Sequence, residues 1–416
     1  MNIAMTIILW IMYFISLYFA VFWLIIFVTR DDDNEEEILQ EFPFVSVTIP
    51  AYNEEKSIKT TIESVINLEY PKDRFEVLVV SDGSTDNTES LVREAIESNK
   101  KYNIQLITQK NKGKGAALNK ALNKAKGEFF VCLDADSFID NDALLKMLPY
   151  FKDEKVAAVL PSLKVHKPEK LLEKLQWYEY IINMFYKELM GKLNCVHVAP
   201  GPFSVYRTSI IKEIGKFDEN NITEDLEIAL RLQYNDYKIV QVMNTEVTTL
   251  APDTIKELYT QRNRWFKGAL LNAFKYKKMM FNKKYGDFGF IQMPTIIFSG
   301  VIAITLVSTI LYYGMKPYIE YLYNLRLVNF DFITFLKNIN INFALFDLNY
   351  VTVFIAVVML TVTLYIMKKS EVRTNEKLLK YGSFGVIVYL IFYFLFLGIV
   401  WLGVLVDIAR GKKQAW

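Results

Sequence analysis

Residues that build zinc sites and disulfide frameworks are scarce in this sequence. Its 416 residues include only two cysteines and two histidines. Cys132 and Cys195 lie far apart and form no CxxC pair, so neither a structural zinc site nor a disulfide framework is expected. A reducing compartment fits this composition best.

An excess of charge of one sign is also lacking. The formal net charge is +2, with 48 Lys and Arg against 46 Asp and Glu. Because binding to the phosphate backbone depends on a strongly basic surface, this balance argues against nucleic acid as a partner. Basic residues therefore have to be interpreted locally.

Apolar residues, in contrast, are abundant and make up 52% of the chain. A helix needs roughly 20 apolar residues to cross a bilayer. Four runs are therefore interpreted as transmembrane helices: residues 6–28, 289–313, 350–367 and 386–406. The first run is too long for the core of a signal peptide and has neither a basic segment before it nor a cleavage site, so it is expected to be retained.

These runs divide the chain into four parts. Residues 1–30 are expected to form a transmembrane helix, 31–251 a globular catalytic domain, 252–287 an amphipathic helix at the membrane surface, and 288–416 a transmembrane region of about three spans. An ordinary surface helix is the alternative for 252–287. The basic residues that alternate with apolar ones in this segment are Arg262, Arg264, Lys267, Lys275, Lys277, Lys278, Lys283 and Lys284.

Basic residues beside apolar runs predict the cytoplasmic side of a membrane. By this rule the globular domain and the loop that follows residue 367 face the cytosol. Four simple spans would then place Arg410, Lys412 and Lys413 on the opposite side. Either the last segment does not cross simply, or the weakly apolar stretch 325–348 contributes a further membrane element.

The first part of the globular domain alternates between two periodicities. Strands are predicted at 45–49, 76–80, 104–108 and 128–133, and helices at 54–68, 86–98 and 114–125. Such alternation predicts a mostly parallel α/β sheet, in which ligands bind beyond the carboxyl ends of the strands.

Two short motifs follow the first two predicted strands. In the first motif, Asn53 can cap the next helix and Glu54 and Glu55 can complement its dipole. In the second, Asp82 can accept hydrogen bonds from a nucleotide base or ribose, and Asp86 can cap a helix. Ordinary turns are the alternative at both positions.

Three further motifs carry side chains that could take part in a reaction. Asp134 and Asp136 follow a strand and can hold a hard divalent cation that keeps positions open for diphosphate oxygens. Asp225 begins a helix and can act as a general base on an attacking hydroxyl, although Thr223 and the acids after it also fit a capped helix. Such acids alone do not identify an enzyme.

The last motif is Gln261-Arg-Asn-Arg-Trp265. Arg264 can hold a leaving diphosphate by charge-assisted hydrogen bonds. Trp265 offers an apolar face on which a sugar ring can rest, or it anchors the helix at a membrane interface.

In this order and spacing, the motifs resemble processive family 2 glycosyltransferases, which include cellulose, chitin, hyaluronan and poly-N-acetylglucosamine synthases. The matching motifs begin at Pro50, Asp82, Asp134, Thr223 and Gln261. The resemblance covers roughly residues 45–267 and is strongest to bacterial poly-β-1,6-N-acetylglucosamine synthases. It departs from the family in the stretch 199–207, where prolines flank Gly201 and the acceptor pocket is expected to differ.

The resemblance implies a GT-A fold and a role for each matching residue. Catalysis is assigned to Asp225 with Glu224 and Thr223, and the metal site to Asp136. Donor binding is assigned to Ala51, Tyr52, Glu54, Asp82, Lys114, Asp134, Gln261, Arg264 and Trp265.

The resemblance also implies a reaction. A UDP-sugar, with UDP-N-acetylglucosamine as the first choice, would pass its sugar with inversion to a growing β-linked polysaccharide that is extruded across the cell membrane. Mg²⁺ or Mn²⁺ would be the cofactor, and membrane lipids and an accessory subunit would be further partners. The alternatives are a non-processive enzyme that acts on a lipid carrier or glycolipid, and a transport or binding protein.

Overall fold

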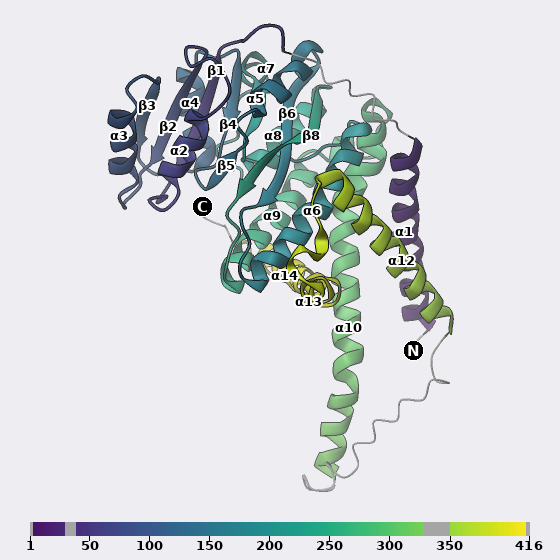
Figure 1. The fold of residues 1–416 in the computed structure, drawn as a ribbon. Coiled ribbons are helices and arrows are strands. Elements are labelled where there is room, and N and C mark those ends of the chain that lie inside the picture. Colours follow the sequence, from purple (N-terminus) through teal and green to yellow (C-terminus); the bar gives the residue numbers. More distant parts are fainter. Residues whose placement is uncertain (1–2, 30–38, 328–349, 413–416) are drawn as a thin grey trace.

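An eight-stranded sheet forms the framework of the globular part (Figure 1). The computed structural model describes residues 3–29, 39–327 and 350–412. The strands are β1 Val45–Ala51, β2 Phe75–Asp82, β3 Ile104–Gln109, β4 Phe129–Cys132, β5 Ser137–Ile139, β6 Val156–Val165, β7 Ser204–Arg207 and β8 Lys238–Thr249. Their order is β3-β2-β1-β4-β7-β6-β8-β5, and the first four run parallel, whereas β7 and β5 are antiparallel to their neighbours.

Helices cover both faces of this sheet. They are α2 Ile58–Ile66, α3 Thr88–Ser98, α4 Lys114–Lys124, α5 Ala143–Met147, α6 Leu171–Lys192, α7 Thr208–Glu213, α8 Glu224–Tyr234 and α9 Ile255–Lys275. Short 3₁₀ turns are η1 Leu148–Lys152, η2 Lys277–Met279, η3 Lys283–Tyr285 and η6 Leu378–Tyr381. Successive residues of a strand point to opposite faces. In β2, Val77 and Val79 therefore pack in the core with α2 and α3, and Leu78 and Val80 in the core with α4 and α8.

The predicted alternation of strands and helices is confirmed, with small shifts at the ends of the elements. All eight residues of β2 are buried, as expected for a parallel strand covered on both faces. The largest shift concerns the helix predicted to begin at residue 54, because α2 begins at Ile58. The preceding residues are held by the neighbouring loop instead.

Long apolar helices occupy all four runs predicted to span a membrane. They are α1 Ile3–Thr29, α10 Met293–Leu327 after the π-helical turn η4 Phe288–Gln292, α12 Tyr350–Thr374, and a last helix made of α13 Ser383–Val388, the π-helical turn η7 Tyr389–Tyr393 and α14 Phe394–Ala409. Within the described residues, two helices, Phe288–Glu320 and Ser383–Ala409, are long and apolar enough to cross a membrane by length and composition. Most of the stretch 325–348 lies outside the described residues, and Lys413 lies outside them too.

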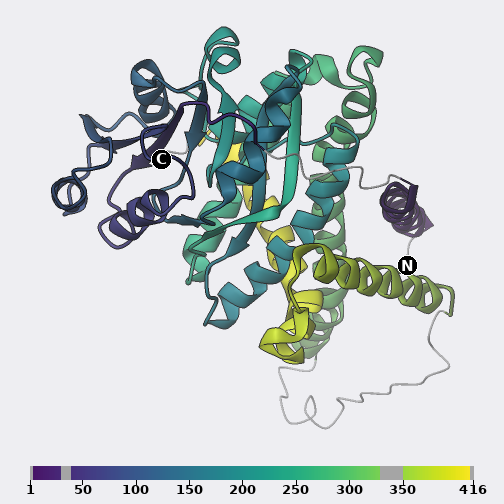
Figure 2. The same ribbon diagram turned by 45° about the horizontal axis from the view of Figure 1, so that its top comes forward.

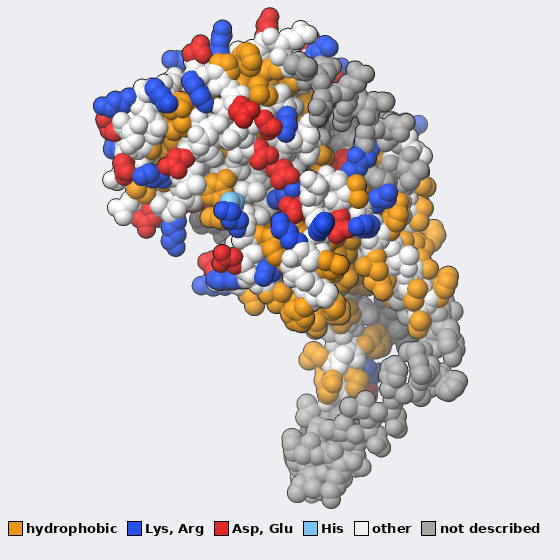
Figure 3. Space-filling model, in the orientation of Figure 1, with side chains coloured by type: hydrophobic (Ala, Val, Ile, Leu, Met, Phe, Trp, Pro, Cys, Tyr) orange, Lys and Arg blue, Asp and Glu red, His pale blue; other side chains and the backbone are white. Residues whose placement is uncertain are grey.

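Helix α6 joins the sheet to these apolar helices (Figure 2). Near its C-terminal end, Phe185 and Leu189 form a cluster with Trp23 of α1 and Ile366 of α12. Nearer its start, Trp177 and Tyr178 share the main core with residues of η7. In the space-filling view, charged side chains cover the sheet domain, and apolar side chains gather over the lower helices (Figure 3).

Candidate active site

The loops that follow β1 and β2 hold each other in place. Asn53 has a φ of 58°, and its side-chain oxygen accepts a hydrogen bond from the backbone N–H of Thr85 at 2.8 Å. The backbone N–H of Glu55 donates to Asp86 at 3.1 Å. The interpretation of Asn53 as a helix cap is therefore wrong, because its side chain organises the loop after β2.

Asp82 organises a third loop. One carboxylate oxygen accepts hydrogen bonds from the side chain of Gln109 at 2.7 Å and the backbone of Lys112 at 2.9 Å. The other accepts from the backbone of Gly113 at 2.7 Å. These bonds fix the start of α4, and the direct nucleotide contact expected of Asp82 stays a prediction.

Lys114, the first residue of α4, lies at the centre of the site. Its ammonium nitrogen is 2.6 Å from a carboxylate oxygen of Asp134 and 3.2 Å from one of Glu224. Burial by itself would lower the pKa of Lys114, but these two carboxylates outweigh it and raise the pKa well above its ordinary value. Lys114 therefore stays charged and joins the loop after β4 to the start of α8.

Three acids crowd together beside this lysine. Burial, followed by the charge of Asp134, raises the pKa of Asp136 to about 6. Burial also raises the pKa of Glu54 to about 7, a hydrogen bond from Ser57 opposes the shift, and Asp136 and Asp134 add to it. The structure thus brings Glu54 of the first motif close to Asp134 and Asp136 of the third.

This acidic cluster fits a divalent cation. Carboxylates are hard oxygen ligands, and a cation would offset both the burial and the mutual repulsion that raise the pKa values of Asp136 and Glu54. In the described parts of the chain, no three His, Cys, Asp or Glu side chains group as a complete metal site. Mg²⁺ is typically held by one or two carboxylates together with substrate phosphates and water, so the donor would supply the remaining ligands.

Asp225 lies in the first turn of α8, next to Glu224. Its half-buried carboxylate accepts a hydrogen bond from the backbone of Leu226 at 2.8 Å. Burial, followed by the charge of Glu224, raises its pKa to about 6, although Lys114 and Arg264 favour the charged form. A carboxylate with such a pKa can accept a proton near neutral pH.

The loop between α6 and β7 presses against these charged groups. A Cβ atom at Gly201 would lie 2.4 Å from both carboxylate oxygens of Asp134 and 2.4 Å from the ammonium of Lys114. The backbone N–H of Ala199 donates to the carbonyl oxygen of Asp225 at 3.2 Å. A side chain at residue 201 would therefore displace Asp134 or Lys114 from the observed ion pair.

Helix α9 carries the last motif, and some of its basic side chains lie inside the protein. Arg262 and Lys267 are buried. The guanidinium of Arg262 lies 4.2 Å above the ring of Trp265, so one face of this ring is already covered. Gln261 accepts a hydrogen bond from Arg262, and Arg264 contributes positive charge near Asp225.

Three further predicted residues are Thr223, Tyr52 and Ala51. Thr223 is at the N-cap position of α8 but makes no side-chain capping bond, and its hydroxyl accepts a hydrogen bond from Asn272 of α9 at 3.1 Å. A Cβ atom at Gly268 would lie 2.2 Å from this hydroxyl, so α8 and α9 approach closely here. At the other end of the site, Tyr52 is exposed and Ala51 is buried.

Sequence reasoning did not identify Lys187 of α6 as part of this region. Burial lowers its pKa to about 8, and its electrostatic partner is Asp225. Burial of His197, followed by the charge of Lys187, lowers the pKa of His197 to about 4. Neither residue belongs to a recognisable motif, so only the packing of α6 reveals their position.

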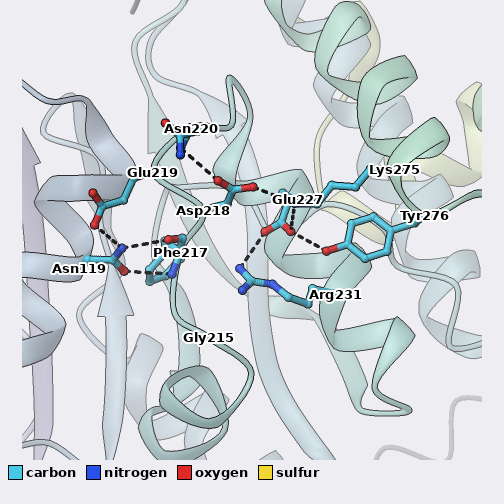
Figure 4. Close-up of a pocket in the computed structure, with 10 residues that line it drawn as sticks. All are labelled: Asn119, Gly215, Phe217, Asp218, Glu219, Asn220, Glu227, Arg231, Lys275 and Tyr276. Atoms are coloured by element: carbon cyan, nitrogen blue, oxygen red, sulfur yellow. Dashed lines mark hydrogen bonds and ion pairs between the residues drawn. The ribbon is translucent and has the colours of Figure 1, made fainter.

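A separate pocket of about 570 Å³ lies between α4, α8 and α9 (Figure 4). Its buried centre is Glu227, which accepts hydrogen bonds from Tyr276 at 2.5 Å, Lys275 at 2.8 Å and Arg231 at 2.8 Å. None of the predicted site residues lines this pocket. The polar groups around Glu227 pair with one another, so they brace α8 against α9.

Comparisons with known proteins agree with this geometry. The family described as "Glycosyl transferase family 2" matches residues 46–215. A poly-beta-1,6-N-acetyl-D-glucosamine synthase of Staphylococcus epidermidis is 29% identical over 350 residues, covering 80% of this chain and 83% of the relative. A second protein of that name from Staphylococcus epidermidis is 30% identical over 319 residues, covering 74% of this chain and 75% of the relative.

Among solved structures, the mannosyltransferase PcManGT from Pyrobaculum calidifontis, in complex with GDP-Man and Mn²⁺, has a TM-score of 0.61. It is 17% identical, and the match covers 99% of this chain and 98% of that one. This similarity supports the fold, and together with the family match it confirms a GT-A catalytic domain combined with apolar helices. The identity and coverage of the staphylococcal synthases, together with the family match, show that the chain is a member of the family 2 glycosyltransferases.

Proposed function

We propose that this enzyme transfers N-acetylglucosamine from UDP-N-acetylglucosamine to a growing β-linked polysaccharide. The observation that carries the proposal is the joining of Asp134 and Glu224 by Lys114, which brings the donor-side acid beside the predicted base Asp225. The sugar and the linkage follow from the name of the staphylococcal relatives. The division into residues 1–30, 31–251, 252–287 and 288–416 is part of the same proposal.

In the proposed reaction, Asp225 removes the proton from an acceptor hydroxyl, which attacks the anomeric carbon from the face opposite the leaving UDP. The bond from that carbon to the diphosphate breaks, and inversion converts an α-linked donor into a β-linked product. Arg264 stabilises the negative charge that develops on UDP. Lys114 holds Asp134 and Glu224 in place throughout.

A divalent cation, Mg²⁺ or Mn²⁺, would be held by Asp136 and the donor diphosphate. When bound, it would neutralise charge on the leaving group. Asp134 and Glu54 line the same acidic cluster, so their positions decide how closely the diphosphate approaches.

Membrane attachment completes the proposal. The two helices that meet the length and composition criterion, together with α1 and α12, would anchor the catalytic domain on the cytosolic side and line a route for the polymer. Membrane lipids would surround these helices, and an accessory subunit remains a proposed partner. The alternative is a non-processive enzyme that modifies a lipid carrier or glycolipid at the same membrane surface.

The donor is tested by measuring UDP release by the purified, detergent-solubilised enzyme with a panel of UDP-sugars and either Mg²⁺ or Mn²⁺. We expect UDP-N-acetylglucosamine to be preferred, chelation by EDTA to abolish release, and gel analysis to show a long polymer. A short product that extracts into organic solvent would favour the lipid-carrier alternative. Metal-independent release would contradict the assignment of Asp136.

The rate of transfer should also depend on pH. Since the pKa of Asp225 is raised to about 6, the base is protonated below that pH and ionised above it. The transfer rate at saturating donor should therefore fall as the pH decreases through about 6 and reach a plateau toward neutral pH. The charged groups that act on Asp225 are Glu224, Lys114, Arg264 and Lys187. A rate that stays constant across this range would argue against Asp225 as the base.

A further inference from the structure

Arg262 is a buried charge for which the proposed reaction has no use. Its side chain is 0% exposed, and its guanidinium forms an ion pair with Glu179 of α6. The hydroxyl of Tyr393 donates to the same oxygen of Glu179 at 2.8 Å. A charge leaves water at a high energetic cost and is retained only when partners such as these compensate it.

The three residues come from three separate elements. Arg262 lies in α9, Glu179 in α6, and Tyr393 ends the π-helical turn η7 within the apolar helix Ser383–Ala409. A π-helical turn interrupts the regular hydrogen bonding of a helix and frequently marks a functional position. The hydrogen bond from Tyr393 thus joins this ion pair to an apolar helix that we propose spans the membrane.

Other contacts run along the same interface. The ring of Phe266 stacks on that of Trp401 in α14, with centroids 4.6 Å apart and planes inclined by 7°. A Cβ atom at Gly403 would lie 2.0 Å from the hydroxyl of Tyr259, so the last helix packs closely on α9. One side of α9 therefore packs against the apolar helix.

The same segment of α9 carries the residues proposed to bind the donor. The guanidinium of Arg262 lies 4.2 Å above the ring of Trp265, so the position of Arg262 determines the plane of that ring. Arg264, one residue before the tryptophan, acts electrostatically on Asp225. A displacement of Arg262 would therefore change the surroundings of both the proposed donor site and the proposed base.

We propose that Glu179, Arg262 and Tyr393 form a positioning set that completes the donor site only when the apolar helix Ser383–Ala409 is docked on α9. The inference rests on the proposed function for the roles of Trp265 and Arg264. It adds a dependence of sugar transfer on one hydroxyl group of an apolar helix. Through this connection, the rate of sugar transfer would depend on how the apolar helix is docked on α9.

The Tyr393→Phe variant removes this hydroxyl and keeps the ring. Tyr389→Phe is the matched control, because Tyr389 is also buried, lies in the same turn and stacks on Tyr393 with centroids 5.4 Å apart. Hydrogen bonds to charged groups are among the stronger ones in proteins. We therefore expect kcat/KM for the UDP-sugar, measured by UDP release from the full-length enzyme, to fall roughly tenfold in Tyr393→Phe and less than about twofold in the control.

A double-mutant cycle with Trp265→Phe separates positioning from simple loss of stability. If Tyr393 acts through Trp265, its substitution should lower kcat/KM much less in the Trp265→Phe background than in the wild type, while the two changes in Tm add. Equal losses in both backgrounds, or equal rates for Tyr393→Phe and Tyr389→Phe, would overturn the inference. A wild-type enzyme that releases no UDP from any UDP-sugar would instead overturn the proposed function.

Discussion

Replacing Asp225 by asparagine is expected to abolish sugar transfer while leaving the binding of the UDP-sugar largely intact. The amide has nearly the same shape as the carboxylate but cannot accept the proton of the attacking hydroxyl. Loss of a general base typically costs about 10²- to 10⁴-fold in rate. The transfer rate is measured by UDP release, and donor binding by calorimetry.

Stability should not account for this loss. Folding raises the pKa of Asp225 from 3.8 to about 6, so its ionised form opposes folding at neutral pH. The asparagine variant should therefore unfold at a temperature no lower than the wild type. Asp153→Asn is the control, since this carboxylate pairs with Lys238 at the surface. An Asp225→Asn enzyme that transfers sugar within about tenfold of the wild-type rate would refute the role of Asp225 as the base.

The Gly201→Ala substitution is the second change expected to have a large effect. Its methyl group would lie 2.4 Å from Asp134 and from Lys114, a separation far below van der Waals contact. Either the loop moves or the paired side chains are displaced, and both shift Asp134 relative to the proposed metal site and the proposed base. Because a displacement of about 1 Å can cost 10²-fold in rate, we expect a loss of transfer on the order of 100-fold.

Gly191→Ala provides the matched control for this substitution. Gly191 lies near the end of α6, and a Cβ atom there would find its nearest neighbour at an ordinary 3.5 Å. Its transfer rate should stay close to that of the wild type. If Gly201→Ala retained the same rate, the contact between the loop and the Lys114 ion pair would have no importance for catalysis.

Several features of the fold were predictable because they depend on local pattern. The run of apolar residues at the centre of β2 and the helical spacing of apolar residues in α4 can be recognised directly in the sequence. The order of the five motifs likewise predicted the family, which the staphylococcal relatives confirm. The alternative of a transport or binding protein is wrong at this level, because the chain belongs to an enzyme family.

Other features were misjudged because they depend on partners from distant elements. Asn53 has a typical helix-capping side chain, but the loop after β2 offers it Thr85 as a hydrogen-bond donor. Arg262 belongs to a segment expected to form an amphipathic helix at the membrane surface, and that pattern gave no sign that Arg262 is buried against Glu179. A residue type alone does not indicate whether the fold provides such a partner.

By itself, therefore, the sequence determined the alternating strands and helices and the apolar helices, and it supplied the candidate site residues. Only the tertiary structure decided that Lys114 joins Asp134 to Glu224, that residue 201 lies against this ion pair, and that the last apolar helix is bonded through Tyr393 to Glu179 of α6, the partner of Arg262. The physical reason is that periodicity and turn chemistry act between near neighbours in the chain. Ion pairing, desolvation and steric exclusion act between groups that only folding brings together.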